Sequence, residues 1–144
     1  MTVADDAAGV RVELTIPAQP AYVSVARLAI LGIASRMPFT YDEVEDIRLA
    51  VGEACTHAIA RVQAADGAHP NVRIVCTVEP RRLQIEVIDD APATEAPEAA
   101  PEASPFDEAQ LGGVLIRILM DEVEQRTDPE TGAHVLRMVK HLLR

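Results

Sequence analysis

The chain has 144 residues and a mass of 15.5 kDa, the size of one domain whose core needs no disulfide bonds. Hydrophobic residues make up 49% of it and aromatic residues only 3%, so we expect a core of Val, Ile, Leu and Ala. A formal net charge of −10 argues against nucleic acid or an anionic membrane as the main partner and favours a basic protein.

The first residues of the chain are acidic and small, and we interpret 1–8 as a frayed terminus. The sequence has neither a recognisable signal peptide nor an apolar run of membrane-spanning length, so we expect a cytoplasmic protein. Residues 10–16 alternate between apolar and polar side chains and predict a half-buried strand that Pro17 ends. A helix is expected from Pro20 to about Met37.

A second helix is predicted to begin at a capping box formed by Thr40 and Glu43, whose side chains can each satisfy an unpaired backbone amide. The two cysteines, Cys55 and Cys76, have no CxxC spacing and no nearby ligand cluster, so we interpret them as small buried hydrophobic residues. The buried stripe of this helix is predicted to consist of Val44, Ile47, Val51, Ala54 and Ala58.

Strands are predicted at 72–78 and 83–89, a third helix at 107–120, and a closing hairpin of 122–127 with 134–142. Strands with one polar face and helices with one apolar stripe indicate two layers. The expected fold class is therefore α/β (α+β): a two-layer sandwich in which a mixed, mostly antiparallel sheet carries helices on one face, with residues 1–144 forming a single domain.

Residues 91–105 depart from this pattern, because they are rich in Pro and contain nothing aliphatic larger than Ala. Such a segment lacks the backbone donors of a continuous helix or a central strand. We interpret it as a long loop inserted between a strand and a helix, and loops of this length are often lids or binding loops.

Glu53 and His57 are four residues apart on the second helix and therefore share a face, together with Asp46 and Ala50. One interpretation is a carboxylate general base beside a polar group that holds a metal or a phosphate. The alternative is an exposed pair on a solvated helix, which spacing alone favours because such pairs are common.

Two further features could bind a ligand. Asp89 ends an alternating strand, where its carboxylate can accept a hydrogen bond from a ligand amine or cap the following turn. Gly112 and Gly113 open the apolar part of the third helix, where backbone amides can face an anion, although loop flexibility explains adjacent glycines equally well.

Three motifs in a fixed order resemble those of the bacterial anti-sigma-factor serine kinases, regulators of stress response and sporulation. Residues 53–57 (E-A-C-T-H) resemble the E-A-C-T-N box of that family, and 87–91 (V-I-D-D-A) resemble its V-x-D-x-G strand end. Residues 115–123 (L-I-R-I-L-M-D-E-V) are close to its L-I-x-x-L-M-D-E-V junction. The family belongs to the ATPase superfamily of gyrase, Hsp90 and histidine kinases, so the resemblance implies the Bergerat, or histidine-kinase-like ATPase, fold.

The resemblance also implies roles for individual residues. Glu53 falls at the position of the catalytic base, and Asp89 at that of the Asp that binds the adenine amino group. Gly112 matches a glycine of the phosphate-binding motif with Gly113 beside it, and residues 91–105 occupy the place of the ATP lid. Such proteins use ATP and magnesium, keep a sigma factor from RNA polymerase, phosphorylate a serine of an anti-anti-sigma protein, and commonly act as dimers.

The departures from the family pattern gather at the nucleotide. His57 stands where the family has the Asn that coordinates magnesium, and imidazole is a poor substitute for a hard oxygen ligand. Ala91 and Ala93 replace glycines that allow close approach of the backbone, Gly113 falls where the family has a larger residue, and Ala133 follows Gly132 where a Thr is common. We therefore assign no residue as a metal ligand and expect weak or no use of ATP.

Three hypotheses remain open. The first is an anti-sigma factor with weak or lost kinase activity, which sequesters a sigma factor and is released by an anti-anti-sigma partner. The second is a working serine kinase in which His57 and a substrate oxygen hold the metal. The third is a domain of this fold that binds some other protein or ligand. A partner surface could involve charged residues of the first two helices: Arg27, Arg36, Asp42, Glu45 and Asp46.

Overall fold

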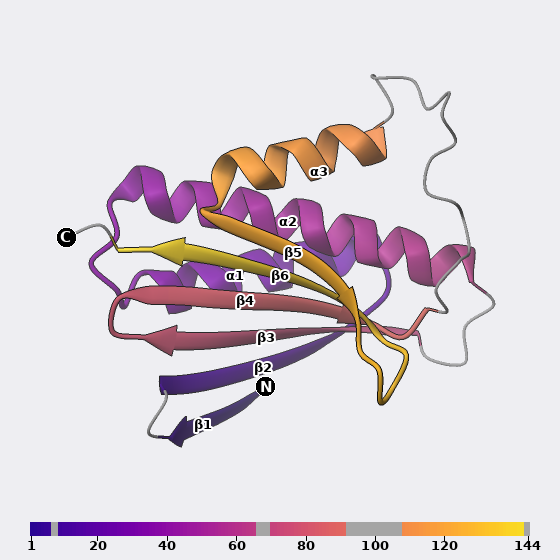
Figure 1. Cartoon of the computed structure of the whole chain (residues 1–144), viewed down its shortest axis with the longest axis horizontal. Coiled ribbons are helices and arrows are strands. Elements are labelled where there is room, and N and C mark those ends of the chain that lie inside the picture. The colour runs from indigo at the N-terminus through magenta and orange to yellow at the C-terminus, as the bar shows by residue number, and fades with distance from the viewer. Residues whose placement is uncertain (7–8, 66–69, 92–107, 143–144) are drawn as a thin grey trace.

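The computed structural model describes residues 1–6, 9–65, 70–91 and 108–142 (Figure 1). Within these described residues, six strands form one sheet in the order β1-β2-β3-β4-β6-β5, and three α-helices accompany them. The strands are β1 (Thr2–Asp6), β2 (Gly9–Pro17), β3 (Asn71–Glu79), β4 (Arg82–Asp89), β5 (Glu122–Thr127) and β6 (His134–His141), and the helices are α1 (Val23–Ala34), α2 (Tyr41–Ala64) and α3 (Glu108–Leu119), with a 3-10 turn at Pro20–Tyr22 before α1.

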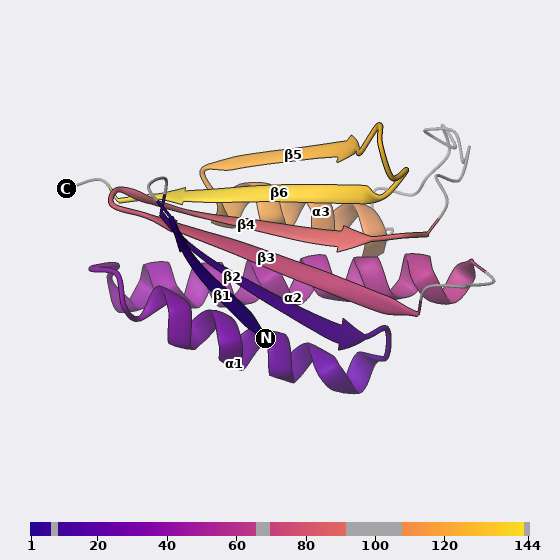
Figure 2. The same ribbon diagram turned by 90° about the horizontal axis from the view of Figure 1, so that it is seen from below.

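Every pair of neighbouring strands in this sheet is antiparallel. Figure 2 shows that the helices cover one face of the sheet and leave the other face bare. The two-layer α+β fold expected from the strand and helix patterns is confirmed, and its pairing is antiparallel throughout the described strands. None of the helices in the described part of the chain is long and apolar enough to cross a membrane.

The expectation of a frayed start to the chain was wrong, because β1 pairs with β2 at the edge of the sheet. Gly9 begins β2 with a φ of 136°, and a Cβ at this position would collide with the carbonyl oxygen of Val78 on β3. An edge strand is held by main-chain hydrogen bonds, which its side-chain composition does not reveal. The small acidic sequence therefore gave no warning of a strand.

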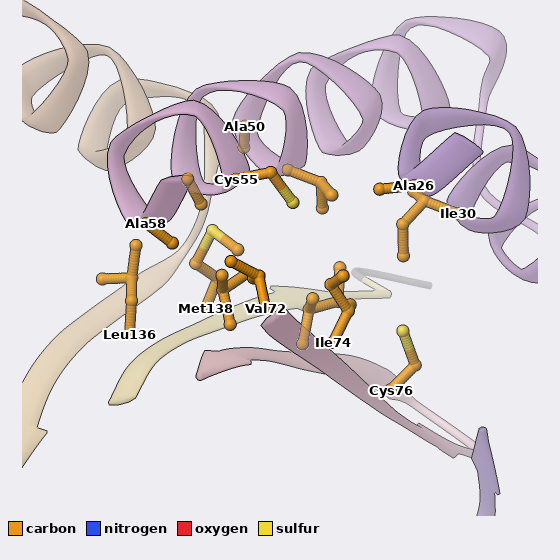
Figure 3. Packing of buried hydrophobic residues seen from close by; sticks show 14 of the residues in the cluster. Ala26, Ile30, Ala50, Cys55, Ala58, Val72, Ile74, Cys76, Leu136 and Met138 are labelled. Atoms are coloured by element: carbon orange, nitrogen blue, oxygen red, sulfur yellow. The ribbon is translucent and has the colours of Figure 1, made fainter. Parts of the chain in front are cut away.

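The core lies between α2 and the covered face of the sheet, and every residue of the predicted α2 stripe is buried. Figure 3 shows Cys55 and Ala58 on the side of α2 that faces the sheet, with Met138 and Leu136 of the sheet below them. Cys76 is also buried, and burial raises the pKa of both thiols to about 12. The interpretation of the cysteines as small core residues is confirmed.

The ends of the first two helices differ in how well they could be predicted. The capping box at the start of α2 is present: the Thr40 amide donates to the Glu43 carboxylate at 2.7 Å, and the Glu43 amide donates to the Thr40 hydroxyl at 3.1 Å. Helix α1 ends at Ala34, earlier than expected, and its apolar residue Leu28 is 68% exposed. The core face of α1 consists of Val23, Ala26, Ile30 and Ala34, and the two alanines allow close packing against α2.

Candidate functional site

A cleft of about 140 Å³ lies where α2, α3 and the ends of β4 and β6 meet. The small side chains Ala54 and Ala58 form its helical floor and leave room above α2. The other described residues that line it are His57, Arg61, Val87, Asp89, Gly113, Ile116, Arg117, Val123, Gln125, His134 and Leu136.

The structure brings together three of the five residues that the sequence singled out. His57, Asp89 and Gly113 line the cleft, whereas Glu53 is not among its described lining residues. Glu53 is half-buried one turn before His57, and no hydrogen bond or ion pair joins it to another residue in the described part of the chain. The predicted pairing of a base with a polar neighbour is therefore present along the helix, but only His57 faces the cleft.

Asp89 is the acidic residue of the described cleft lining, and its side chain is fully buried. The carboxylate Oδ2 lies 3.2 Å from Arg61 Nε and 3.4 Å from His134 Nδ1, and Oδ1 accepts a hydrogen bond from the Ala91 amide at 3.1 Å. A buried carboxylate is costly unless it is paired and hydrogen-bonded, and these three partners meet that need. We refer to Asp89, Arg61 and His134 as the Asp89 cluster.

Both uses of Asp89 that the sequence left open can now be judged. The capping interpretation is confirmed by the hydrogen bond from Ala91, two residues further on. The acceptor that was expected to face a ligand amine is instead paired with two basic side chains of the same chain. The predicted strand end is correct, and the surroundings of its carboxylate were not foreseen.

Sequence reasoning missed Arg61 and His134, and only one of them left a usable signal. Arg61 lies one helical turn after His57, so the periodicity that paired Glu53 with His57 extends to it. His134 reaches the cluster because β6 pairs with β4 in a register that sets it directly opposite Asp89. That register depends on the pairing of strands separated by the whole of α3 and cannot be read from local sequence.

The two glycines do not lie where a helix offers free amides. Helix α3 starts at Glu108, so Gly112 and Gly113 are its fifth and sixth residues. Only the first four amides of a helix lack a partner within the helix. Gly113 lines the cleft, and the binding of an anion by the glycine amides stays a prediction. Residues 92–105 of the predicted lid, Ala93 among them, lie outside the described residues.

The other polar groups of the cleft give it a basic lining. Arg117 projects from α3 and is exposed, and the imidazole Nε2 of His134 lies 3.4 Å from the side-chain oxygen of Gln125. Asp89 is the one acidic residue among the described lining residues, and it is already paired. The cleft therefore presents positive charge within a chain of net negative charge.

The fold agrees with comparisons to known proteins. The model of the family described as "Histidine kinase-like ATPase domain" matches residues 16–140 of the chain. The chain belongs to this family. The match runs from the end of β2 into β6 and so includes every residue of the described cleft.

Curated relatives place the chain in one branch of the family. It is 36% identical over 140 residues to the serine-protein kinase RsbW of Bacillus subtilis, covering 91% of this chain and 85% of the relative. It is 37% identical over 123 residues to the RsbW of Bacillus pumilus, covering 78% and 76% of the two chains. The resemblance to the anti-sigma-factor serine kinases is thereby confirmed.

A solved structure of the RsbU and RsbW domains of a Mycobacterium tuberculosis protein has the same fold, with a TM-score of 0.66 at 14% identity. The alignment covers 92% of this chain and 32% of that longer one. At this level of identity the similarity concerns the fold, and it supports the two-layer architecture described above.

The described residues provide a poor fit for ATP and magnesium. Pockets that bind small molecules usually enclose about 300–1,000 Å³, and this cleft encloses about 140 Å³. His57 contributes an imidazole, whereas magnesium prefers oxygen ligands. The carboxylate of Asp89 is buried among partners from its own chain.

Proposed function

We propose that the protein is an anti-sigma factor that sequesters an alternative sigma factor, is released by an anti-anti-sigma protein, and has weak or lost kinase activity. Its similarity to RsbW serine-protein kinases over most of the chain supports the family role. The observation that carries the loss of kinase activity is the Asp89 cluster, whose carboxylate is fully buried and paired internally.

An acidic surface on α2 supports binding to a basic protein. Asp42 is exposed on the first turn, and Glu45 is paired with Arg48 at 2.6 Å on the next. Asp46 lies 3.8 Å from Lys140 and keeps 40% of its side chain exposed. Arg48 and Lys140 offset part of this acidic charge, and the exposed remainder would speed encounter with a basic partner and help to select it. We propose this face of α2 as part of the sigma-contacting surface.

The test begins with the tagged protein expressed in its native cells without added nucleotide. We expect an RNA polymerase sigma factor to be captured and identified by mass spectrometry. The purified sigma factor is then titrated with the protein in competition with core polymerase, and occupancy of the polymerase is expected to fall. Recovery of partners unrelated to transcription would instead favour a repurposed binding domain of the same fold.

Charge reversal locates the surface in the same assay. Asp42→Lys is expected to weaken sigma binding by about tenfold or more, since close charge pairs across an interface are worth roughly 1.5 kcal/mol or above. The matched control is Glu130→Lys, which makes the same change on the exposed turn between β5 and β6. Equal binding by both variants would remove α2 from the proposed surface.

A working serine kinase is the second candidate, because the curated relatives carry that name and Glu53 is retained. It predicts transfer of labelled phosphate from ATP to a serine of an anti-anti-sigma protein. Glu53→Ala should abolish that transfer if Glu53 is the base, while Glu45→Ala on the same helix should not. Phosphotransfer that survives Glu53→Ala would contradict this assignment.

The setting that we propose follows the family: a cytoplasmic regulator of stress response or sporulation, acting as a homodimer. Light scattering of the purified protein tests the last point directly. A mass near 31 kDa, twice the 15.5 kDa of the chain, is expected, and a mass of one chain would contradict it.

A further inference from the structure

We propose that Arg61 and His134 themselves exclude adenine from this domain, by holding Asp89 in an internal ionic cluster. This inference rests on the proposed weak or lost use of ATP and names the residues responsible. It differs from an explanation based on His57 alone, because it locates a second block at the base-recognition end of the cleft. Restoring a magnesium ligand at position 57 would then leave the domain unable to bind nucleotide.

The geometry of the cluster carries the proposal. Arg61 comes from α2 and His134 from β6, so two elements on opposite sides of the cleft converge on one carboxylate oxygen. The side chain of Arg61 keeps 29% of its surface exposed and that of His134 keeps 23%, whereas that of Asp89 keeps none. The two basic side chains thus line the same cleft as the carboxylate and are the more exposed members of the cluster.

The chemistry of the competing donors points the same way. An adenine amino group is a neutral donor, whereas the Arg61 guanidinium is a permanent cation. Both donors would form a charge-assisted hydrogen bond with the carboxylate, but only Arg61 adds the attraction between two opposite full charges. A nucleotide that displaced Arg61 would exchange the stronger interaction for the weaker and leave a cation without its buried partner.

The other carboxylate oxygen, Oδ1, also has a hydrogen-bond partner. The Ala91 amide donates to Oδ1 at 3.1 Å, and Ala91 is itself buried. A carboxylate has about four acceptor positions, and three neighbours already face this one. These contacts leave about one acceptor position, and a further donor could reach it only past Arg61 and His134, since the Ala91 amide belongs to the turn that follows β4.

The experiment measures binding of ATP and of GTP, each with magnesium, by titration calorimetry. The proteins are the wild type, His57→Asn, and the triple variant His57→Asn/Arg61→Ala/His134→Ala. We expect no binding by the wild type or by His57→Asn, and at least a tenfold gain in ATP affinity for the triple variant over His57→Asn. ATP should be preferred to GTP, because GTP carries a carbonyl oxygen where adenine carries its amine.

Adding Asp89→Asn to the triple variant provides the decisive control. If Asp89 is the freed acceptor, this change should remove the gained affinity and the preference for ATP. Binding by His57→Asn as tight as that of the triple variant would overturn the proposal. So would a triple variant that folds and does not bind, or one whose binding is unaffected by Asp89→Asn.

Removing Arg61 could prevent folding, so circular dichroism accompanies each titration. If the triple variant is unfolded, the variant His57→Asn/Arg61→Met/His134→Ala decides, because Met keeps most of the volume of the Arg61 side chain and offers Asp89 no donor. ATP binding that Asp89→Asn abolishes would support the proposal, and no binding would overturn it. Sigma capture by the wild type is scored separately, so failure of the proposed function is distinguishable from failure of this inference.

Discussion

Both halves of α2 pack apolar residues against the sheet, but only the second half adds an ion pair to that packing. The first half packs Ile47 and Val51, both fully buried, into an apolar core. The second half places His57 over the cleft and joins Arg61 to Asp89 by an ion pair. Apolar packing depends on size and shape, whereas a buried ion pair depends on both partners being present. The core can therefore persist while the cleft changes its chemistry.

Strand β4 makes the same contrast within a few residues. Leu83, Ile85, Val87 and Asp89 alternate along one strand and all are buried, so Asp89 occupies what would be the next core position. In a strand with period two, residues at this spacing point to the same face. A charged carboxylate therefore lies at the end of a row of buried apolar side chains. The ion pairs of the Asp89 cluster offset the cost of burying it.

The largest loss of stability is expected from a truncation in the apolar row of β4. Ile85→Ala should lower the free energy of unfolding by about 4 kcal/mol, because it leaves a cavity at a residue with no exposed surface. Urea denaturation measures the change. Leu28→Ala, at a residue that is 68% exposed, should stay within about 0.5 kcal/mol of the wild type. Similar losses for both variants would contradict the placement of the core.

The next largest loss of stability is expected from breaking the Asp89 cluster. Arg61→Ala should lower the free energy of unfolding by about 2–3 kcal/mol, since it leaves Asp89 buried with its strongest partner removed. Adding Asp89→Asn removes the buried charge, so the double variant should be about 1 kcal/mol more stable than Arg61→Ala alone. The same urea titration measures both. Simple addition of two losses would show that the pair is not coupled.

The start of α2 should show a smaller effect. Thr40→Ala removes one side of the capping box and should cost about 1 kcal/mol in the free energy of unfolding. Thr56→Ala makes the same change in the middle of α2, where the hydroxyl bonds only to the Gly52 carbonyl, and should cost less than about 0.5 kcal/mol. Thermal melting of the two variants side by side provides the measurement.

The smallest effect concerns an exposed pair on the hairpin. The pKa of Glu122 lies below its ordinary value, first because of the hydrogen bond with His141 and then because of that with Arg137. A carboxyl group whose pKa is lower in the folded than in the unfolded state stabilises the folded protein at pH values above its unfolded-state pKa. This stabilisation is lost as the pH falls through the folded-state pKa. His141→Ala should raise the pKa of Glu122 toward the ordinary range in an NMR titration. His57→Ala, on the opposite layer, should leave it unchanged.

The predictability of the molecule follows the same division. The α2 stripe and the strand alternations could be predicted, because periodic burial repeats along a local stretch of sequence. Strand β1 could not, since main-chain pairing at a sheet edge leaves little trace in side chains. The site residues on α2 were found by helical spacing, yet Arg61 was overlooked one turn further on. His134 was beyond reach, because the β4–β6 register joins residues far apart in the chain.

Titration of the wild-type protein with ATP and magnesium by calorimetry tests the central claim most directly, namely that the scaffold persists while the nucleotide site is closed. The Asp89 cluster and the imidazole at position 57 predict no measurable heat of binding at millimolar nucleotide. Saturable binding in the micromolar range would contradict the claim, because it would require Asp89 to exchange its internal partners for adenine.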